Sequence, residues 1–260
     1  MNDNRSGHVW PEALGRLSDS SHAPESAQRT PNERLVSFFA PSSFEAEQYR
    51  GLRHIVEESG RHVVAITSPT PGDGKTTTAI NLAGALAQAS GTRVLLVEAD
   101  LRQPRVGDQL GLEGSDTRGL ADALADDRLT LPDVVRHLPR FNLSVLLSGR
   151  SPASPYEGLH SSRLDELLEE ARSHYAHIVV DTPPVVPVPD CRLIARIVDG
   201  FLILVGAHRT RRELLQEALV ALDPTKILGL VFNGDDRSRR GYYGYYTSPA
   251  EGGRLSNARQ

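Results

Sequence analysis

Residues 63–78 constrain the fold of this chain more than any other stretch. Val63–Ile66 is a short apolar run rich in β-branched residues, which is typical of a buried strand. The next segment, Ser68–Gly74, holds two prolines and two glycines, so neither a helix nor a strand can continue through it. A helical pattern begins at Thr76. Strand, glycine-rich loop, Lys-Thr and helix in this order predict a phosphate-binding loop.

Each residue of this loop has a chemical reason to be there. Gly72 and Gly74 let backbone N–H groups turn toward an anion without a Cβ in the way, and the start of the next helix adds partial positive charge. Lys75 is expected to reach the β- and γ-phosphates of a nucleotide, and the Thr76 hydroxyl to bind Mg²⁺. Pro69 stands where the usual motif has its first glycine. The expected nucleotide-binding residues are Gly72, Asp73, Gly74, Lys75, Thr76, Thr77 and, near the end of the last expected strand, Asn233.

Composition narrows the class of protein. The chain has 260 residues, 39% of them hydrophobic, which is enough for one sizeable core. A net charge of −4 gives no general attraction to nucleic acid, so no nucleic-acid partner is expected. Cys191 is the single cysteine, which excludes a disulfide framework. No apolar run approaches the roughly 18 residues of a membrane helix and no apolar signal region is evident, so a cytoplasmic protein is expected.

The chain divides into three parts. Residues 1–34 are rich in Ser, Pro, Asn and Arg without an apolar period, and we expect them to be disordered. Residues 35–234 alternate between strand and helix patterns, which predicts one α/β domain with a mostly parallel sheet. Residues 235–260 form a flexible tail that carries four of the seven tyrosines, at Tyr242, Tyr243, Tyr245 and Tyr246.

Within the domain, the patterns predict a series of short elements. Strands are expected near 62–68, 93–97, 143–147, 177–180, 201–205 and 227–232. Helices are expected over 44–58, 120–124, 131–138, 163–174 and 213–222. Two more are expected, one from the phosphate-binding loop to about residue 89 and one through residue 197 with Asp190 as its cap. Residues 103–116 are expected to form a mobile loop. In the first helix Leu52, Ile55 and Val56 share one face, and Glu47, Arg50 and Arg53 form a charged face.

Three carboxylates follow expected strands. Glu98 and Asp100 come at the end of the second strand and Asp181 at the end of a later one. The carboxyl ends of parallel strands face the ligand crevice of an open sheet, so these side chains are expected to converge on the phosphate-binding loop. Mg²⁺ prefers oxygen ligands, and Thr76, Asp100 and Asp181 are its expected ligands. The expected cofactors are therefore ATP and Mg²⁺.

These motifs together resemble the bacterial tyrosine kinases of capsule and exopolysaccharide systems, the BY-kinases. The loop resembles their Walker A motif, Leu-Leu-Val-Glu98-Ala-Asp100-Leu-Arg102 their second motif, and Ile-Val-Val-Asp181-Thr-Pro-Pro their Walker B motif. Glu47-x-x-Arg50-x-x-Arg53 matches the oligomerisation motif of the family, and the tyrosine cluster completes the set. Glu98 replaces an aspartate that is thought in the family to help accept the tyrosine proton.

The resemblance implies a P-loop fold of the Par/Min type and a protein-tyrosine autokinase. Lys75, Glu98, Asp100 and Asp181 would be catalytic, and the four tail tyrosines would accept phosphate in trans. Glu47, Arg50 and Arg53 would build a ring of identical subunits. The resemblance also implies a separate membrane-anchored activator of the chain-length-determinant type, which would recruit the kinase to the inner face of the membrane. A tyrosine phosphatase is a further expected partner.

Two other functions fit part of the sequence. A Par- or Min-type ATPase shares the fold, but such proteins carry a signature lysine near the start of the loop, where this chain has Thr70, and they have no tyrosine tail. A nucleotide-gated regulator with weak or no catalysis would follow if the change at Glu98 had ended kinase activity. Phosphotyrosine, free phosphate or neither, formed from ATP and Mg²⁺, would distinguish the three.

Overall fold

A computed structural model describes residues 30–112, 118–150 and 154–235 of the chain. These residues form a seven-stranded sheet in the order β3-β4-β2-β5-β1-β6-β7, with every neighbouring pair parallel except β3 and β4. The strands are β1 Val63–Thr67, β2 Val94–Glu98, β3 Arg136–Leu138, β4 Leu143–Leu146, β5 His177–Asp181, β6 Gly200–Gly206 and β7 Ile227–Asn233. The expected mostly parallel α/β sheet is confirmed.

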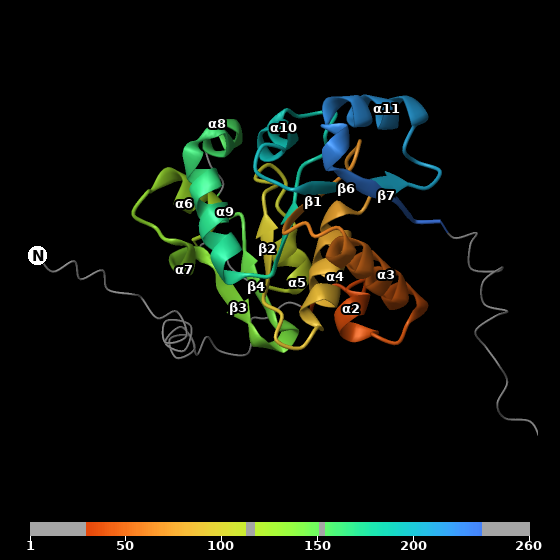
Figure 1. The fold of residues 1–260 in the computed structure, drawn as a ribbon, viewed down its shortest axis with the longest axis horizontal. Coiled ribbons are helices and arrows are strands. Elements are labelled where there is room, and N and C mark those ends of the chain that lie inside the picture. The colour runs from red at the N-terminus through yellow and green to blue at the C-terminus, as the bar shows by residue number, and fades with distance from the viewer. Residues whose placement is uncertain (1–29, 113–117, 151–153, 236–260) are drawn as a thin grey trace, which may run out of the picture.

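Helices cover both faces of the sheet (Figure 1). They are α2 Val36–Phe39, α3 Phe44–Glu58, α4 Lys75–Ala87, α5 Val106–Leu110, α6 Leu120–Ala125, α7 Leu131–Val134, α8 Pro155–His160, α9 Ser162–His174, α10 Asp190–Ile194 and α11 Arg212–Ala221, with short 3₁₀ turns η2 Pro139–Phe141 and η3 Pro224–Lys226. No helix within the described ranges is both long and apolar enough to span a membrane.

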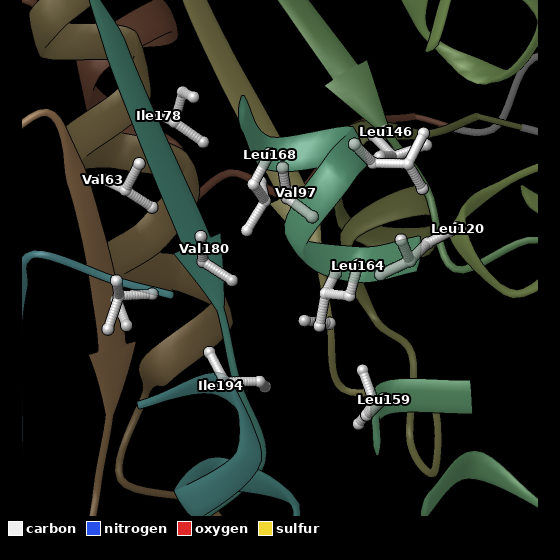
Figure 2. Close-up of a cluster of buried hydrophobic side chains, with 14 of the residues drawn as sticks. Val63, Val97, Leu120, Leu146, Leu159, Leu164, Leu168, Ile178, Val180 and Ile194 are labelled. Carbon is white, nitrogen blue, oxygen red and sulfur yellow. The ribbon is translucent and has the colours of Figure 1, made fainter. Parts of the chain in front are cut away.

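The core consists of two apolar clusters, one on each face of the sheet. Alternate residues of β1 supply them, because successive side chains of a strand point to opposite faces. Val63 and Ala65 belong to the cluster under α9, where Figure 2 shows Leu164 and Leu168 close to the strand residues. Val64 and Ile66 belong to the cluster under α3 and α4. The central strands are therefore buried on both sides, as their continuous apolar runs predict.

Several local expectations were wrong. Residues 103–116 contain α5 rather than only a loop, and the helix expected over 131–138 ends at Val134, after which β3 pairs antiparallel with β4. Leu138 precedes Pro139, and the residue before a proline is biased toward extended backbone. In α3, Leu52 and Val56 are buried as expected, but Ile55 is 49% exposed.

Asp190 does not cap a helix through residue 197. It is the first residue of α10, which ends at Ile194, and the N-cap position is occupied by Pro189. Its carboxylate instead forms a two-pronged ion pair with Arg102, with oxygen–nitrogen distances of 2.6 and 3.0 Å. The contact spans 88 positions of sequence, so local pattern gives no sign of it.

The N-terminal boundary of the domain also shows contacts. Within the segment expected to be disordered, the N–H of Asn32 donates to the carbonyl of Gln109 at 2.9 Å, and the carbonyl of Arg34 accepts from the Asn81 amide at 2.9 Å. Residues 30–34 therefore lie against α4 and α5.

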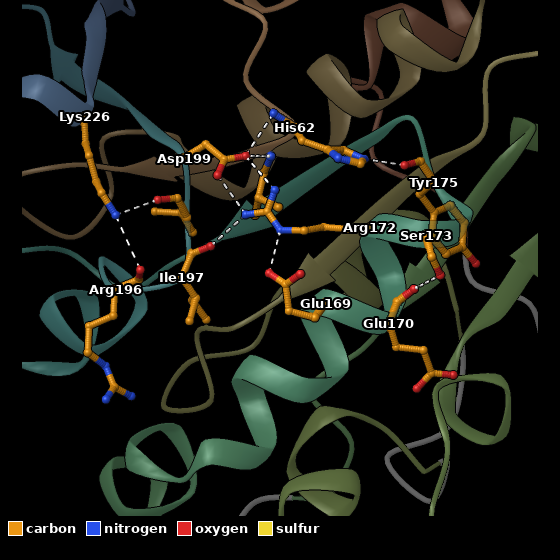
Figure 3. A network of polar contacts seen from close by, with 12 residues as sticks. His62, Glu169, Glu170, Arg172, Ser173, Tyr175, Arg196, Ile197, Asp199 and Lys226 are labelled. Carbon is orange, nitrogen blue, oxygen red and sulfur yellow. Dashed lines mark hydrogen bonds and ion pairs between the residues drawn. The ribbon is translucent and has the colours of Figure 1, made fainter.

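A polar network at Asp199 joins α9, the start of β1 and the segment before β6 (Figure 3). One Asp199 oxygen accepts hydrogen bonds from the N–H groups of His62 and Val63, at 3.0 and 2.7 Å. Arg172 of α9 donates to both oxygens, at 2.9 and 2.7 Å. Partial burial raises the pKa of Asp199, but Arg172 and the two N–H groups lower it more strongly, to about 2.

We predict that Asp199→Asn destabilises the fold by about 2 kcal/mol, because hydrogen bonds to a charged group are among the stronger ones. The folded pKa of about 2 lies below the ordinary 3.8, so the ionised carboxylate contributes full stability above pH about 4 and loses it as the pH falls toward 2. Urea unfolding between pH 7 and pH 2.5 measures this. The variant should lose less stability on acidification than the wild type, whereas parallel pH curves would contradict the prediction.

Asp126→Asn is the matched control for this experiment. The pKa of Asp126 also lies at about 2, owing first to the Arg128 side chain, but Arg128 is 90% exposed and only two residues away, so this pair is a local surface contact. It should change neither the stability at pH 7 nor the acid slope appreciably.

Candidate active site

The phosphate-binding loop joins β1 to α4, as the sequence predicts. Gly72 and Gly74 have φ angles of +84° and +96°, a region that favours glycine because other residues are strained there. Gly74 is the N-cap of α4, and no side chain caps the first turn. The N–H groups of that turn are therefore available to an anion.

Side chains from the β6–α11 connection and from β7 hold this loop in place. The Asp73 carboxylate is buried and accepts hydrogen bonds from the hydroxyls of Thr70, at 2.8 Å, and Thr210, at 3.0 Å. The Asn233 amide donates to the Asp73 carbonyl at 2.9 Å. Arg209 donates to the Gly72 carbonyl at 3.0 Å. Asp73 and Asn233 thus brace the loop, and their contact with a nucleotide stays a prediction.

Sequence reasoning missed Arg209 and Thr210. They lie in the β6–α11 connection, more than 130 positions from the loop that they contact. No local motif marks them. Only the parallel order of β1 and β6 would have suggested that the connection after β6 lies beside the loop after β1.

Asp181 lies at the carboxyl end of β5, in the middle of the sheet, and is 1% exposed. Neither of its carboxylate oxygens has a hydrogen-bond partner of good geometry among the described residues. Burial raises the pKa of Asp181 to about 8, although the Thr76 hydroxyl and the Lys75 ammonium lower it. A buried carboxylate without partners is costly, and a cation satisfies it.

The residues around Asp181 suit a magnesium ion, which keeps water or phosphate ligands, better than a metal ion whose ligands all come from the protein. Within the described ranges, no group of three or more His, Cys, Asp or Glu side chains is placed to hold a metal. Mg²⁺ usually binds through one or two carboxylates, with water and phosphate oxygens for the rest. Asp181, Asp100 and the Thr76 hydroxyl at the loop supply such a partial set.

Asp100 lines the cleft and is 9% exposed. One of its oxygens accepts a hydrogen bond from the N–H of Gln103 at 3.0 Å. Burial raises the pKa of Asp100, while the Gln103 N–H and the Lys75 ammonium act in the opposite direction. The expected convergence of carboxylates on the loop therefore holds for Asp100 and Asp181.

Glu98 is differently engaged. It is 2% exposed, and one oxygen accepts hydrogen bonds from the N–H groups of Arg105 and Val106, both at 2.6 Å. The other oxygen accepts from the N–H of Ser148 at 2.9 Å. Glu98 is not among the described residues that line the cleft. Its carboxylate fixes the start of α5 and the segment after β4, which explains why residues 103–116 are not simply a loop.

The cleft above the loop has a volume of about 530 Å³, within the usual range for ligand pockets. One wall is apolar and consists of Pro183, Pro184, Pro187 and Val188. The remaining lining is polar or belongs to the loop, namely Arg34, Pro71, Gly72, Gly74, Lys75, Thr76, Thr77, Asp100, Arg102, Gln103, Arg105 and Gln109. The Lys75 ammonium has no hydrogen-bond acceptor within the described part of the chain, so it is available to a phosphate.

The other predicted site residues lie elsewhere or outside the described residues. On α3, Arg50 forms an ion pair with Glu47, and Arg53 pairs with Glu57 at 2.8 Å and donates to the Ala85 carbonyl at 3.2 Å. None of the three expected oligomerisation residues lines the cleft. Tyr242, Tyr243, Tyr245 and Tyr246 fall outside the described residues.

Comparison with known proteins agrees with this geometry. A family described as an AAA domain matches residues 61–205. The chain is 36% identical over 218 residues to tyrosine-protein kinase YwqD of Bacillus subtilis, covering 82% of this chain and 90% of the relative. Some curated tyrosine-protein kinases are longer, and the chain spans 32% of the length of one from Ralstonia nicotianae.

Solved structures distinguish two of the functions considered above. The kinase domain of Escherichia coli tyrosine kinase ETK matches with a TM-score of 0.72 and 28% identity, covering 88% of this chain and 95% of that chain. A ParA family ATPase from Chlorobium tepidum matches with a TM-score of 0.54 and 27% identity, covering 68% of this chain and 76% of that chain. The likeness to the kinase domain is therefore more extensive.

We predict that Glu98→Asp destabilises the protein, although it keeps the negative charge. The side chain is one methylene shorter, so it cannot reach all three N–H groups, and an unsatisfied buried N–H costs about 1–3 kcal/mol. Thermal unfolding measures the effect, with Glu58→Asp, a change at a mostly exposed residue of α3, as the control. Equal melting temperatures for Glu98→Asp and the control would show that the three contacts are not important.

Proposed function

The chain belongs to the bacterial tyrosine-protein kinases, and we propose that it transfers the γ-phosphate of Mg-ATP to its own C-terminal tyrosines in trans. One observation carries the proposal. Asp181, a buried carboxylate with no hydrogen-bond partner of good geometry among the described residues, lies close to Lys75 and Thr76 at the start of α4, and these two residues line a cleft of about 530 Å³. The acceptors would be Tyr242, Tyr243, Tyr245 and Tyr246 of a neighbouring subunit.

The transfer is a displacement at the γ-phosphorus. The bond to the oxygen that bridges the β- and γ-phosphates breaks, a bond to the tyrosine oxygen forms, ADP leaves, and the phenolic proton passes to a base. Lys75 would stabilise the charge on the transferring group, and the N–H groups of the loop would hold the phosphates. Thr76, Asp100 and Asp181 would hold Mg²⁺, which neutralises phosphate charge when bound.

The identity of the base stays a prediction. Glu98 was the expected proton acceptor, but its oxygens accept three backbone N–H groups. Asp100 lines the cleft and its oxygens are less fully engaged, with one accepting from Gln103. This geometry gives Glu98 a positioning role. Asp100 is the candidate for the proton if Thr76 and Asp181 hold Mg²⁺ without it.

The assembly and its regulation follow from the family resemblance. We propose a ring of identical subunits built through Glu47, Arg50 and Arg53, a membrane-anchored activator of the chain-length-determinant type, and an opposing tyrosine phosphatase. The activator would bring the kinase to the inner face of the membrane, where cycles of tail phosphorylation would regulate polymerisation and export of a capsular or exopolysaccharide.

Lys75→Met should reduce phosphotyrosine formation by at least about a hundredfold, because it removes the charge that stabilises the transferring phosphoryl group. Incubation with ATP and Mg²⁺ followed by phosphotyrosine detection measures this. Lys226→Met is the matched control, since these are the only two lysines of the chain and Lys226 donates to the carbonyls of Ala195 and Val198. The control should lose stability but keep activity. Wild-type labelling by Lys75→Met would refute the site.

Arg50→Ala combined with Arg53→Ala should give a smaller assembly and slower phosphorylation in trans. Light scattering over a concentration series measures the mass. Because Arg53 also bonds the Ala85 carbonyl, Arg50→Ala alone separates a lost interface from a weakened α3–α4 contact. His54→Ala, a change at a 70% exposed residue of the same helix, is the control. Identical masses for all variants would contradict the prediction and indicate that this charged face is an ordinary solvated surface.

A further inference from the structure

Two arginines at the rim of the cleft have no ionic partner in the described part of the chain. Arg34 and Arg105 both line the cleft and both are exposed. No carboxylate of the described residues forms an ion pair with either guanidinium. Arg102, the third arginine of the lining, differs because the buried Asp190 holds it in a two-pronged ion pair. The rim therefore presents two uncompensated positive charges.

The backbone of both arginines is firmly placed. The N–H of Arg105 donates to Glu98 at 2.6 Å, and the carbonyl of Arg34 accepts from Asn81 at 2.9 Å. Gln109 joins the two segments, since its carbonyl accepts from the N–H of Asn32 and its side chain accepts from the Thr77 hydroxyl at 3.0 Å. The side chains can move, but they start from fixed positions beside the first turn of α4. Such an arrangement is suited to capture of an anion that arrives with the substrate.

The chemistry of the proposed substrate supplies such an anion. The tail tyrosines occur as two adjacent pairs, Tyr242–Tyr243 and Tyr245–Tyr246, separated by one glycine. Once one tyrosine is phosphorylated, a group with a charge of about −1.5 to −2 lies within a few residues of every remaining acceptor. Arginine binds phosphate through parallel N–H···O bonds, and the prolines in the lining of the same cleft offer an apolar surface to an aromatic ring.

We propose that Arg34 and Arg105 form a subsite for a phosphotyrosine next to the acceptor, so that a partly phosphorylated tail is the preferred substrate. This rests on the proposed kinase activity. The first phosphate on a tail is then added slowly and the later ones faster. Glu98 contributes as a positioning residue, because its carboxylate holds the backbone of Arg105 at the rim.

Matched synthetic peptides test the subsite. Both carry residues 237–249, and one has phosphate on Tyr245. With wild-type protein loaded with ADP and Mg²⁺, which cannot transfer a γ-phosphate, fluorescence anisotropy should show the phosphopeptide binding about tenfold more tightly than the plain peptide. With wild-type enzyme, kcat/KM for the remaining tyrosines should be higher for the phosphopeptide by a similar factor. Equal affinities for the two peptides would overturn the proposal.

The variants Arg34→Gln and Arg105→Gln identify the residues. Each should bring the ratio of phosphopeptide to plain-peptide affinity toward one, while Arg128→Gln, a change at a 90% exposed arginine outside the cleft lining, should leave the ratio unchanged. An equal rise of the KM for ATP with both peptides, at an unchanged ratio, would mean that the arginines bind nucleotide instead. If neither peptide is phosphorylated, the proposed kinase activity fails, and the binding ratio still decides the subsite.

Discussion

The buried carboxylate of Asp181 is the group on which the rest of the site depends. A carboxylate at the centre of a parallel sheet, with no well-formed hydrogen bond from any described residue, is costly and is tolerated only beside compensating charge. That charge comes from Lys75 and from the start of α4, both fixed by the loop after β1. The sheet order brings them together, because β5 is the direct neighbour of β1. The site is thus a consequence of topology as much as of motif. In the proposed function, a divalent cation and nucleotide phosphates would complete its charge balance.

Contacts from distant parts of the chain keep this arrangement rigid. Thr210 and Asn233 brace the loop at Asp73, and Arg209 holds the Gly72 carbonyl. On the other side of the cleft, Asp190 fixes Arg102, and Glu98 fixes the beginning of α5. The contacts of Asp73, Asp190 and Glu98 satisfy buried carboxylates that would otherwise destabilise the fold. The same contacts set the shape of the cleft, so residues that stabilise the fold also shape the candidate site.

The sequence predicts the parts of this protein that local chemistry determines. β1, the loop and α4 follow from an apolar run, two glycines and Lys-Thr, and α3 occupies the range that its pattern predicts. The sequence does not predict the features that depend on contacts between residues far apart in the chain. Residues 106–110 become helical because Glu98 accepts N–H groups at their start, and Asp190 leaves its expected capping role because Arg102 lies opposite. β3 exists because a neighbouring strand is available to Leu138 and the residues before it. Glu98 was expected to accept a proton because the sequence gives no sign of the three N–H groups that bind its carboxylate.

The central claim is that this site transfers phosphate to the tyrosines of the tail. Intact-mass and peptide mass spectrometry after incubation with ATP and Mg²⁺ test it most directly, on the wild type and on a variant with Phe at positions 242, 243, 245 and 246. The account predicts up to four phosphates per wild-type chain, all within the tail, and almost none on the variant. Equal phosphate incorporation by both proteins, or release of free phosphate without any phosphotyrosine, would contradict it.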